Sequence, residues 1–390
     1  MQSQNTCPPT RESALSAAGG DSQWTPGRTV AVGIAGPFSG PSARLGLEMR
    51  RAAELAVEER NASGGIQGIR IEVLAADDQS SIEHGEGIAR YLGTDSSVLG
   101  VVGHYNSDVT LAASDVYHTD GLAMITPIAS HPALTERGLA NVFRYTNRDD
   151  ETGRAIAIYL HGSLGKRRAV VFQAASLYGR SMADEFVRWF TTLGGQVLTR
   201  LPINQGERDF GRLVAGLPAD LDLFFYGGSF EGADLLRAIR GAGFPQCFAT
   251  GDGCWDVANF LEPAAEAAAA GEGVLVLAAS AAVGRVPGSG EFAEQYTRRH
   301  GPIVNYALNS YDAARVLLLA IDRAATAKGA VPGRAEVVAA MRAVPFQGIA
   351  YSRLLAWDAK GDNRASVTVL NVVDHHRFRE IAELGFEPPG

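Results

Sequence analysis

The alternation of short β-branched runs with amphipathic stretches constrains the fold of this 390-residue chain more than any other feature. Residues 29–35 (TVAVGIA) predict a strand that ends in a glycine-rich turn, and residues 44–61 carry apolar side chains at helical spacing. The alternation continues with expected strands at 69–75, 98–103 and 122–125 and expected helices at 82–92 and 109–117. Strands separated by helices of this length predict right-handed crossovers and a mainly parallel sheet covered on both faces.

The same pattern restarts after Asn147. Its expected elements are strands at 169–172, 195–201 and 221–226 and helices at 182–193, 210–217 and 232–242. After about residue 282, expected helices from Glu291 and Tyr306 precede strand-like runs at 354–356 and 367–373. This tail is too short for a third domain, so we expect it to complete two doubly wound units.

The composition excludes several classes of protein. With 46% hydrophobic and 20% charged residues the chain is that of a soluble globular protein, and its net charge of −8 argues against a nucleic-acid partner. No run approaches the roughly 20 apolar residues of a membrane span. Three cysteines make no disulfide framework: Cys247 and Cys254 either meet across a loop or remain ordinary unpaired thiols.

The start of the chain leaves the compartment open. Residues 1–28 are rich in Ser, Thr, Pro, Gln and Gly, and we expect them to form a flexible leader. Residues 6–13 are too polar for the apolar part of a secretion signal, and Cys7 lacks the apolar lead-in of a lipid-modified cysteine. Either a signal lies upstream, or the start is misassigned, or the protein is not exported.

The usual catalytic signatures are missing from the sequence. There is no phosphate-binding loop and no GxSxG elbow, and the one GxGxxA match, at 288–293, follows a loop rather than a strand. His375-His376 has no third metal ligand at a suitable spacing, so we expect an exposed pair at the edge of the fold. We therefore expect no enzyme activity, no cofactor and no metal.

Polar, glycine-rich turns follow three of these expected strands, at residues 36–41, 103–107 and 126–130, and a fourth, at 250–253, follows a further strand expected just before it. Ligands of open α/β sheets gather at the carboxyl ends of the strands, where helix N-termini offer unpaired N–H groups. Each turn alone is explained equally well as a helix cap or a tight turn. Together they supply hydroxyl and amide donors from the first half of the chain and a carboxylate, Asp252, from the second.

Several longer segments resemble one known family. They include VAVGIAGPFSGPSARLG, VVGHYNSDVTLAASDVY, GLAMITPIASHPALTERG, LYGRSMA and FFYGGSFEGADLLRAIRGAG. Collinearly from about residue 29 to 374, the chain is similar to the periplasmic branched-chain amino-acid-binding proteins, the Leu/Ile/Val-binding, type I solute-binding proteins of ABC importers.

The resemblance implies an α/β, type I periplasmic-binding-protein fold. Two doubly wound parallel-sheet lobes are joined in it by three hinge crossovers, which should fall here near 147–149, 279–283 and 369–372. Lobe 1 is then expected at 29–147 plus 283–369, and lobe 2 at 148–282 plus 370–390.

Site roles follow from the resemblance one position at a time. The hydroxyl groups of Ser107 and Ser130 are expected to hold the ligand α-carboxylate. The ammonium group is expected on the backbone carbonyl of Ile128 and on the carboxylate of Asp252, where the family usually has glutamate. Tyr178 matches the tyrosine that covers the ligand from lobe 2.

Other matched positions form the side-chain pocket or depart from the family. Leu45 stands where an aromatic residue is typical, and Tyr306 stands where phenylalanine is familiar. Ser229 replaces a second tyrosine of lobe 2, which enlarges the pocket or makes it more polar and puts leucine-like specificity in doubt. The disulfide of well-studied relatives would fall at Ser80 and Asn106, so it is absent here.

The resemblance therefore predicts a monomeric, periplasmic solute-binding protein. It should bind a neutral or aliphatic, branched-chain-like amino acid between its lobes, close about the hinge and present the closed form to the membrane permease of an ABC importer. Two alternatives remain. One is an amide- or amino-acid-sensing regulator of the same fold, and the other is a transporter-type receptor for a small carboxylate.

Overall fold

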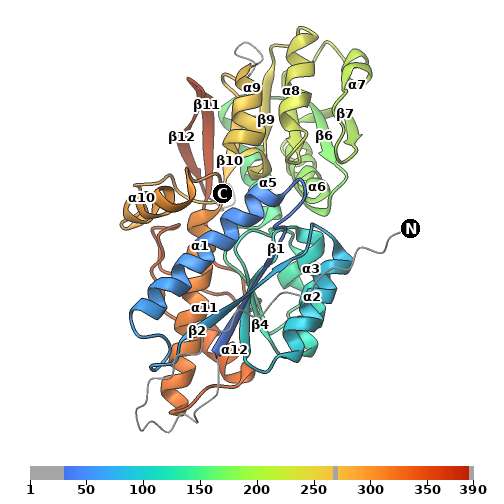
Figure 1. The fold of residues 1–390 in the computed structure, drawn as a ribbon. Coiled ribbons are helices and arrows are strands. Elements are labelled where there is room, and N and C mark those ends of the chain that lie inside the picture. Colours follow the sequence, from blue (N-terminus) through green and yellow to red (C-terminus); the bar gives the residue numbers. More distant parts are fainter. Residues whose placement is uncertain (1–29, 267–270, 386–390) are drawn as a thin grey trace, which may run out of the picture.

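The computed structural model describes residues 30–266 and 271–385 and contains two sheets, one in each of two lobes (Figure 1). The first sheet has the strand order β2-β1-β3-β4-β5, and all its strands run parallel. These strands are β1 (Val30–Gly36), β2 (Ile71–Asp77), β3 (Val98–Gly103), β4 (Ala123–Thr126) and β5 (Val142–Arg144). The helices of this lobe are α1 (Ala43–Ala62), α2 (Ile82–Thr94), α3 (Ser107–Thr119), α4 (Ala133–Glu136), α10 (Ser289–His300), α11 (Ala307–Lys328) and α12 (Arg334–Ala343).

The second sheet has the order β12-β11-β10-β9-β8-β6-β7. Its strands are β6 (Arg168–Ala174), β7 (Gln196–Ile203), β8 (Leu223–Gly227), β9 (Cys247–Thr250), β10 (Leu275–Ala278), β11 (Thr368–Asp374) and β12 (Arg377–Leu384). The helical elements of this lobe are α5 (Asp149–Ile158), η1 (Tyr159–Ser163), α6 (Leu177–Thr192), α7 (Gly211–Ala215), α8 (Gly232–Gly241), η2 (Asp252–Cys254), η3 (Val257–Leu261) and α9 (Glu262–Glu266). The five parallel strands, read β7-β6-β8-β9-β10, repeat the order of the first sheet, and only β11 and β12 are antiparallel additions. The two mainly parallel, doubly wound units expected from the sequence are confirmed.

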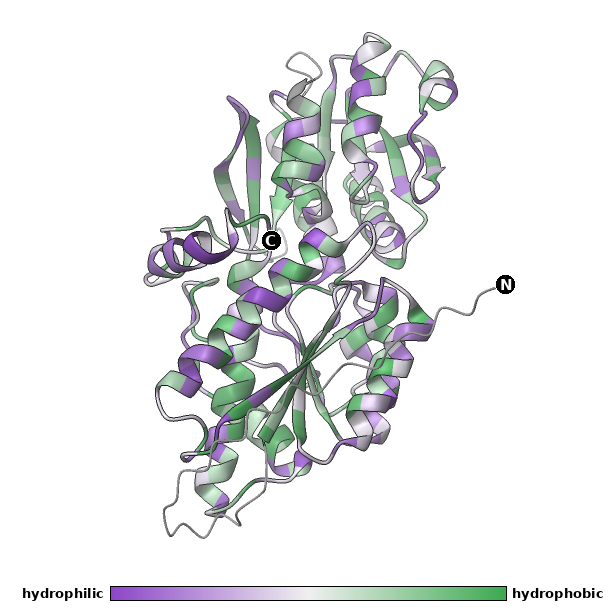
Figure 2. Ribbon diagram, in the orientation of Figure 1, coloured by the Kyte–Doolittle hydropathy of each residue, from purple (hydrophilic) through white to green (hydrophobic). Residues whose placement is uncertain are grey.

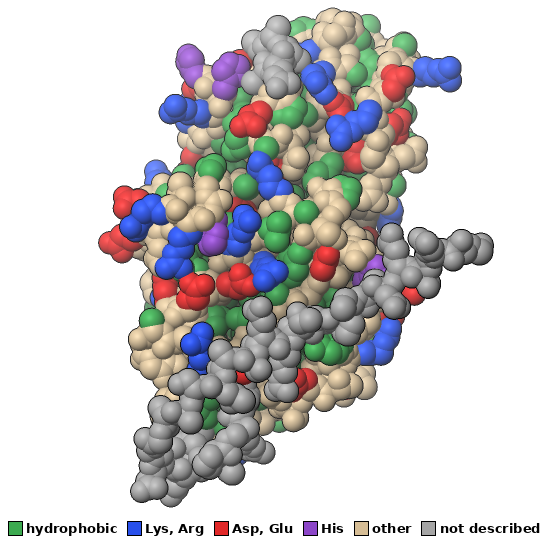
Figure 3. All heavy atoms as spheres, viewed as in Figure 1, with side chains coloured by type: hydrophobic (Ala, Val, Ile, Leu, Met, Phe, Trp, Pro, Cys, Tyr) green, Lys and Arg blue, Asp and Glu red, His purple; other side chains and the backbone are tan. Residues whose placement is uncertain are grey.

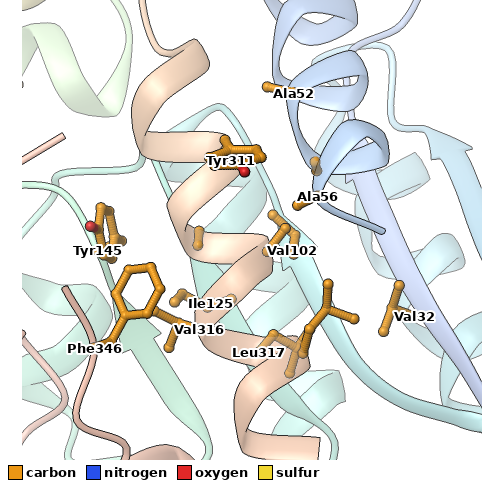
Figure 4. Packing of buried hydrophobic residues seen from close by; sticks show 14 of the residues in the cluster. Val32, Ala52, Ala56, Val102, Ile125, Tyr145, Tyr311, Val316, Leu317 and Phe346 are labelled. Carbon is orange, nitrogen blue, oxygen red and sulfur yellow. The ribbon is translucent and has the colours of Figure 1, made fainter. Parts of the chain in front are cut away.

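Helices cover both faces of the first sheet. Residues of α1 and α11 form one cluster with Val32, Val102 and Ile125 of three neighbouring strands (Figure 4). On the opposite face α2 and α3 enclose a second cluster with the same sheet. Because α11 comes from the last hundred residues, the end of the chain completes the core that its beginning starts.

Hydropathy follows these layers. The central strands are largely hydrophobic, and α10 is mostly hydrophilic (Figure 2). On the face seen in Figure 3 acidic and basic side chains are interspersed. Among the described residues, no helix is both long and apolar enough to cross a membrane.

Three local expectations can now be compared with the fold. Residues 354–356 form no strand: Leu354 is 62% exposed, and an apolar run without a neighbouring strand has no ladder to join. His375 and His376 occupy the turn between β11 and β12, both with positive φ. Cys247 and Cys254 are free thiols, and Cys7 lies outside the described residues.

Candidate ligand-binding site

The carboxyl ends of the strands in both lobes meet at one cavity of about 120 Å³. The first lobe contributes Ser80 after β2, Tyr105 and Asn106 after β3, Ser107 and Asp108 at the start of α3, Ile128 and Ser130 after β4, and Tyr306 before α11. The second lobe contributes Ala174, Ala175 and Ser176 at the end of β6, Tyr178 in the first turn of α6, Gln205 after β7, Ser229, Phe230 and Glu231 after β8, and Asp252 and Gly253 after β9. Loops at this edge of a parallel sheet are the usual place for a ligand.

Asp252 is one of two buried acids that line this cavity, the other being Glu231. The Asp252 side chain is held by two phenol groups: the Tyr178 hydroxyl donates to Oδ1 at 2.7 Å, and the Tyr306 hydroxyl donates to Oδ2 at 2.6 Å. Burial raises the pKa of the Asp252 carboxyl above its usual range, and the two phenol hydrogen bonds oppose that rise. The carboxylate thus has neutral donors but no ion-pair partner among the described side chains, so it can accept a cationic group.

Hydroxyl and amide donors lie on the first-lobe side of the cavity. Ser107 is the first residue of α3, where unpaired backbone N–H groups and the positive end of the helix dipole favour an anion. Ser130 lies in the extended segment after β4, and its backbone carbonyl accepts a hydrogen bond from the Asp149 amide at 3.0 Å. Both serines are buried. A carboxylate could be held here without a full positive charge.

A fully buried histidine, His104, helps to connect the loop after β3 with the loop after β4. His104 Nδ1 lies 2.7 Å from Asp78 Oδ2, and its Nε2 lies 3.1 Å from the Tyr117 hydroxyl. The His104 carbonyl accepts from Thr126 Oγ1 at 3.0 Å, and that hydroxyl oxygen also accepts from the Ile128 and Ala129 amides. The loop after β3 and the loop after β4 are therefore held by one network, which positions the residues that face the cavity.

Most of the site residues expected from the sequence are brought together. Ser107, Ile128, Ser130, Tyr178, Ser229, Asp252 and Tyr306 all line the cavity. Leu45 does not line it: this side chain is 3% exposed near the start of α1 and away from the cavity wall.

Several cavity residues were not assigned to the site from the sequence. Tyr105 and Asn106 lie inside the glycine-rich turn at residues 103–107, so the sequence carries a signal for both positions. Ser176 follows β6 as the N-cap of α6, with its side chain accepting from the Gly179 amide. Gln205 carried no motif, because only the folding of β7 beside β6 brings the loop after it to the cavity.

Side-chain contacts also join the two lobes. Besides Tyr306 and Asp252, Arg44 of α1 pairs with the buried Asp256 of the second lobe at 3.0 Å. The ring of Trp255 meets that of Tyr306 edge-on, with centroids 6.1 Å apart. Within residues 30–266 and 271–385 no cluster of His, Cys, Asp and Glu has the arrangement of a metal site.

Comparison with known protein families decides the identification. Residues 29–374 match the family described as periplasmic binding protein. The chain belongs to this family. Its match extends over almost all of the described residues and includes every side chain of the cavity.

Individual relatives place this periplasmic binding protein near amino-acid-binding members. The Leu/Ile/Val-binding protein homolog 1 of Brucella abortus (strain 2308) is 36% identical over 254 residues, covering 65% of this chain and 67% of the relative. A crystal structure of a leucine binding protein, LivK, from Thermotoga maritima has a TM-score of 0.81 and 26% identity, covering 91% of this chain and 99% of the other. The ABC transporter substrate-binding protein from Desulfitobacterium hafniense in complex with Leu has a TM-score of 0.74 and 28% identity, covering 90% and 100%.

Proposed function

We propose that this chain is the solute-binding component of an ABC importer and takes a neutral L-amino acid, of branched-chain-like size, into the cavity between its lobes. The observation that carries the proposal is Asp252, a buried carboxylate with no cationic partner among the described residues, in a cavity that the buried Ser107 and Ser130 also line. This arrangement matches the two charged ends of a zwitterion. Relatives named for leucine, isoleucine and valine binding support the same class of ligand.

The ligand groups divide between the lobes. Its carboxylate binds at Ser107, Ser130 and the N-terminus of α3, and its ammonium binds at Asp252 and the Ile128 carbonyl. Tyr178 covers it from the second lobe. An isolated charge is costly to bury, so a site that satisfies both ends favours an amino acid over a plain carboxylate or a plain amine.

Closure of the lobes is the signal that the permease reads in this proposal. The hinge crossovers lie near 147–149, 279–283 and 369–372, with lobe 1 at 29–147 plus 283–369 and lobe 2 at 148–282 plus 370–390. Because the two halves of the site lie on different lobes, a bound ligand stabilises the closed arrangement. We further propose that the protein is a periplasmic monomer that releases its ligand chemically unchanged.

A thermal-shift screen tests this function. The purified protein is heated with a panel of L-amino acids, aliphatic amides and small carboxylates, each at high excess. A ligand at 100 times its dissociation constant should add about 2.7 kcal/mol to the free energy of unfolding. We expect neutral L-amino acids to raise the melting temperature. A shift produced only by amides or by carboxylates that lack an amino group would contradict the proposal.

A further inference from the structure

Building on the proposed function, we propose that the preferred amino acid carries a hydroxyl or carboxamide side chain and that Asn106 accepts a hydrogen bond from it. Asn106 is thereby a specificity-determining residue. The wall of the cavity is the first reason. Beyond the two serines assigned to the ligand carboxylate, its polar uncharged side chains are Ser80, Asn106, Ser176, Gln205 and Ser229.

Few of the remaining wall residues suit a hydrocarbon side chain. Leaving the tyrosines and glycine aside, the apolar ones are Ile128, Ala174, Ala175 and Phe230. Leu45, the aliphatic residue expected at the side-chain pocket, is not among them. An aliphatic ligand side chain would therefore lie against hydroxyl and amide groups and separate them from water. Such groups lose free energy when they are buried without hydrogen-bond partners.

Asn106 shows which of these groups needs a partner from the ligand. It stands at the N-cap of α3, yet its side chain makes no capping hydrogen bond. Its Oδ1 atom is buried and makes no hydrogen bond within the described part of the chain, although the residue lines the cavity. A buried carbonyl oxygen of this kind is rare in proteins, and a hydroxyl or N–H group of a ligand would satisfy it.

The charges around the cavity define the ligand side chain further. Asp108, Glu231 and Asp252 line it, and no lysine, arginine or histidine does, so an acidic side chain is disfavoured. Glu231 already accepts from the Tyr226 hydroxyl and the Gly206 amide, both at 2.9 Å, and Asp108 accepts from the Val109 amide at 3.0 Å. Within the described part of the chain all three acids accept only from neutral donors of the protein, so the charge of the wall disfavours an acidic side chain, and the comparison with L-lysine below distinguishes a neutral side chain from a basic one.

Isosteric ligand pairs test the proposal on the unmodified protein. Titration calorimetry compares L-threonine with L-valine and L-asparagine with L-leucine, since each pair differs in polarity far more than in shape. One satisfied hydrogen bond predicts that the polar member binds about tenfold more tightly. Equal or tighter binding of valine and leucine would overturn the proposal, as would strongest binding of L-lysine. If no amino acid binds at all, the proposed function fails instead.

Substitution of Asn106 tests whether this residue causes the preference for a polar side chain. In Asn106→Ala we expect threonine to bind about tenfold more weakly while valine stays within about twofold, so that the preference disappears. Asn204→Ala is the matched control, because Asn204 is exposed and outside the cavity wall, and it should leave both affinities unchanged. An equal loss for threonine and valine in Asn106→Ala would show a general structural role and overturn the assignment.

Discussion

The carboxylate of Asp252 meets phenol groups that come from different lobes. Tyr178 belongs to α6 of the second lobe, whereas Tyr306 precedes α11 in the first. Each hydroxyl uses one lone pair of the carboxylate, which leaves further acceptor positions for an ammonium group. The sequence could indicate the two tyrosines only through family resemblance, since they lie 74 and 54 positions from the aspartate.

Tyr306→Phe tests the effect of the Tyr306 hydroxyl on the pKa of Asp252. The Tyr306 hydroxyl lowers the pKa of Asp252 against the effect of burial, so its loss should raise that pKa further. Because the ligand ammonium requires the ionised acid, the loss of affinity on acidification should begin at a higher pH than in the wild type. The measurement is amino-acid affinity between pH 5 and 8. The exposed Tyr91→Phe serves as control, and superimposable profiles for Tyr306→Phe and wild type would contradict the prediction.

Glu48 predicts a pH dependence of stability. This buried carboxyl accepts from the amides of Asn305 and Tyr306 before α11, but burial raises its pKa from 4.5 to about 7. Between those values the unfolded chain releases the proton that the folded chain retains, so stability falls as pH rises. Relative to Glu48→Gln, the wild type should lose about 3 kcal/mol of unfolding free energy from pH 4.5 to above 7. Urea unfolding across that range measures it, and parallel curves would contradict it.

At the scale of elements, hydrophobic periodicity predicted most of the parallel strands and the long helices. It worked for β1 and α1, where a β-branched run and a helical apolar stripe stand next to each other in the sequence. It did not identify β5 and β10, which have three and four residues, or the antiparallel β12, whose side chains mostly alternate between exposed and half-buried. Short or edge strands depend on a neighbouring strand that the local sequence does not specify.

The candidate site, too, could be predicted only in part from the local sequence. Turns after strands indicated Ser107, Ser130 and Asp252, because the carboxyl ends of parallel strands share one edge of a sheet. Their meeting across two lobes came from family resemblance alone. The placement of Leu45 could not be predicted, because the rotation of α1 against α11 decides which of its side chains faces the cavity.

The start of α6 depends on a glycine. A Cβ atom at Gly179 would lie 2.8 Å from the Ala174 carbonyl oxygen and 2.9 Å from that of Gly227. Gly179→Ala should therefore move α6 away from β6 and β8 and lower the free energy of unfolding by about 1–3 kcal/mol. Gly87→Ala is the matched control: this helical glycine has open space around it, so alanine should add about 0.5–1 kcal/mol. Denaturant unfolding measures the change in unfolding free energy of both variants, and unchanged stability in Gly179→Ala would contradict the prediction.

At the scale of the whole molecule, the two lobes share one strand order and are linked by side chains as well as by the chain itself. Arg44 of α1 reaches Asp256, which caps η3 in the second lobe by accepting from the Ala258 and Asn259 amides. Arg44 is 43% exposed, so solvent weakens this pair. Because the pair crosses the boundary between the lobes, we expect it to stabilise the closed arrangement.

Arg44→Gln should speed ligand release. Loss of a partly exposed pair between the lobes predicts a dissociation rate about two- to fivefold higher, with little change in stability. Stopped-flow release of a bound amino acid measures this rate. Arg50→Gln is the control, since Arg50 pairs with Glu54 within the same helix and should leave release unchanged. An unchanged rate in Arg44→Gln, or an equal effect of both variants, would contradict the role of this pair in closure.

The central claim is that Asp252 receives the ammonium group of an amino acid held between the lobes. The most direct test is titration calorimetry of the wild type and Asp252→Asn with an L-amino acid and with the 2-hydroxy acid of the same side chain. A charge-assisted hydrogen bond predicts that the wild type prefers the amino acid by about 10- to 100-fold and that Asp252→Asn loses this preference. Equal wild-type affinity for the two ligands, or an unchanged preference in Asp252→Asn, would contradict the account.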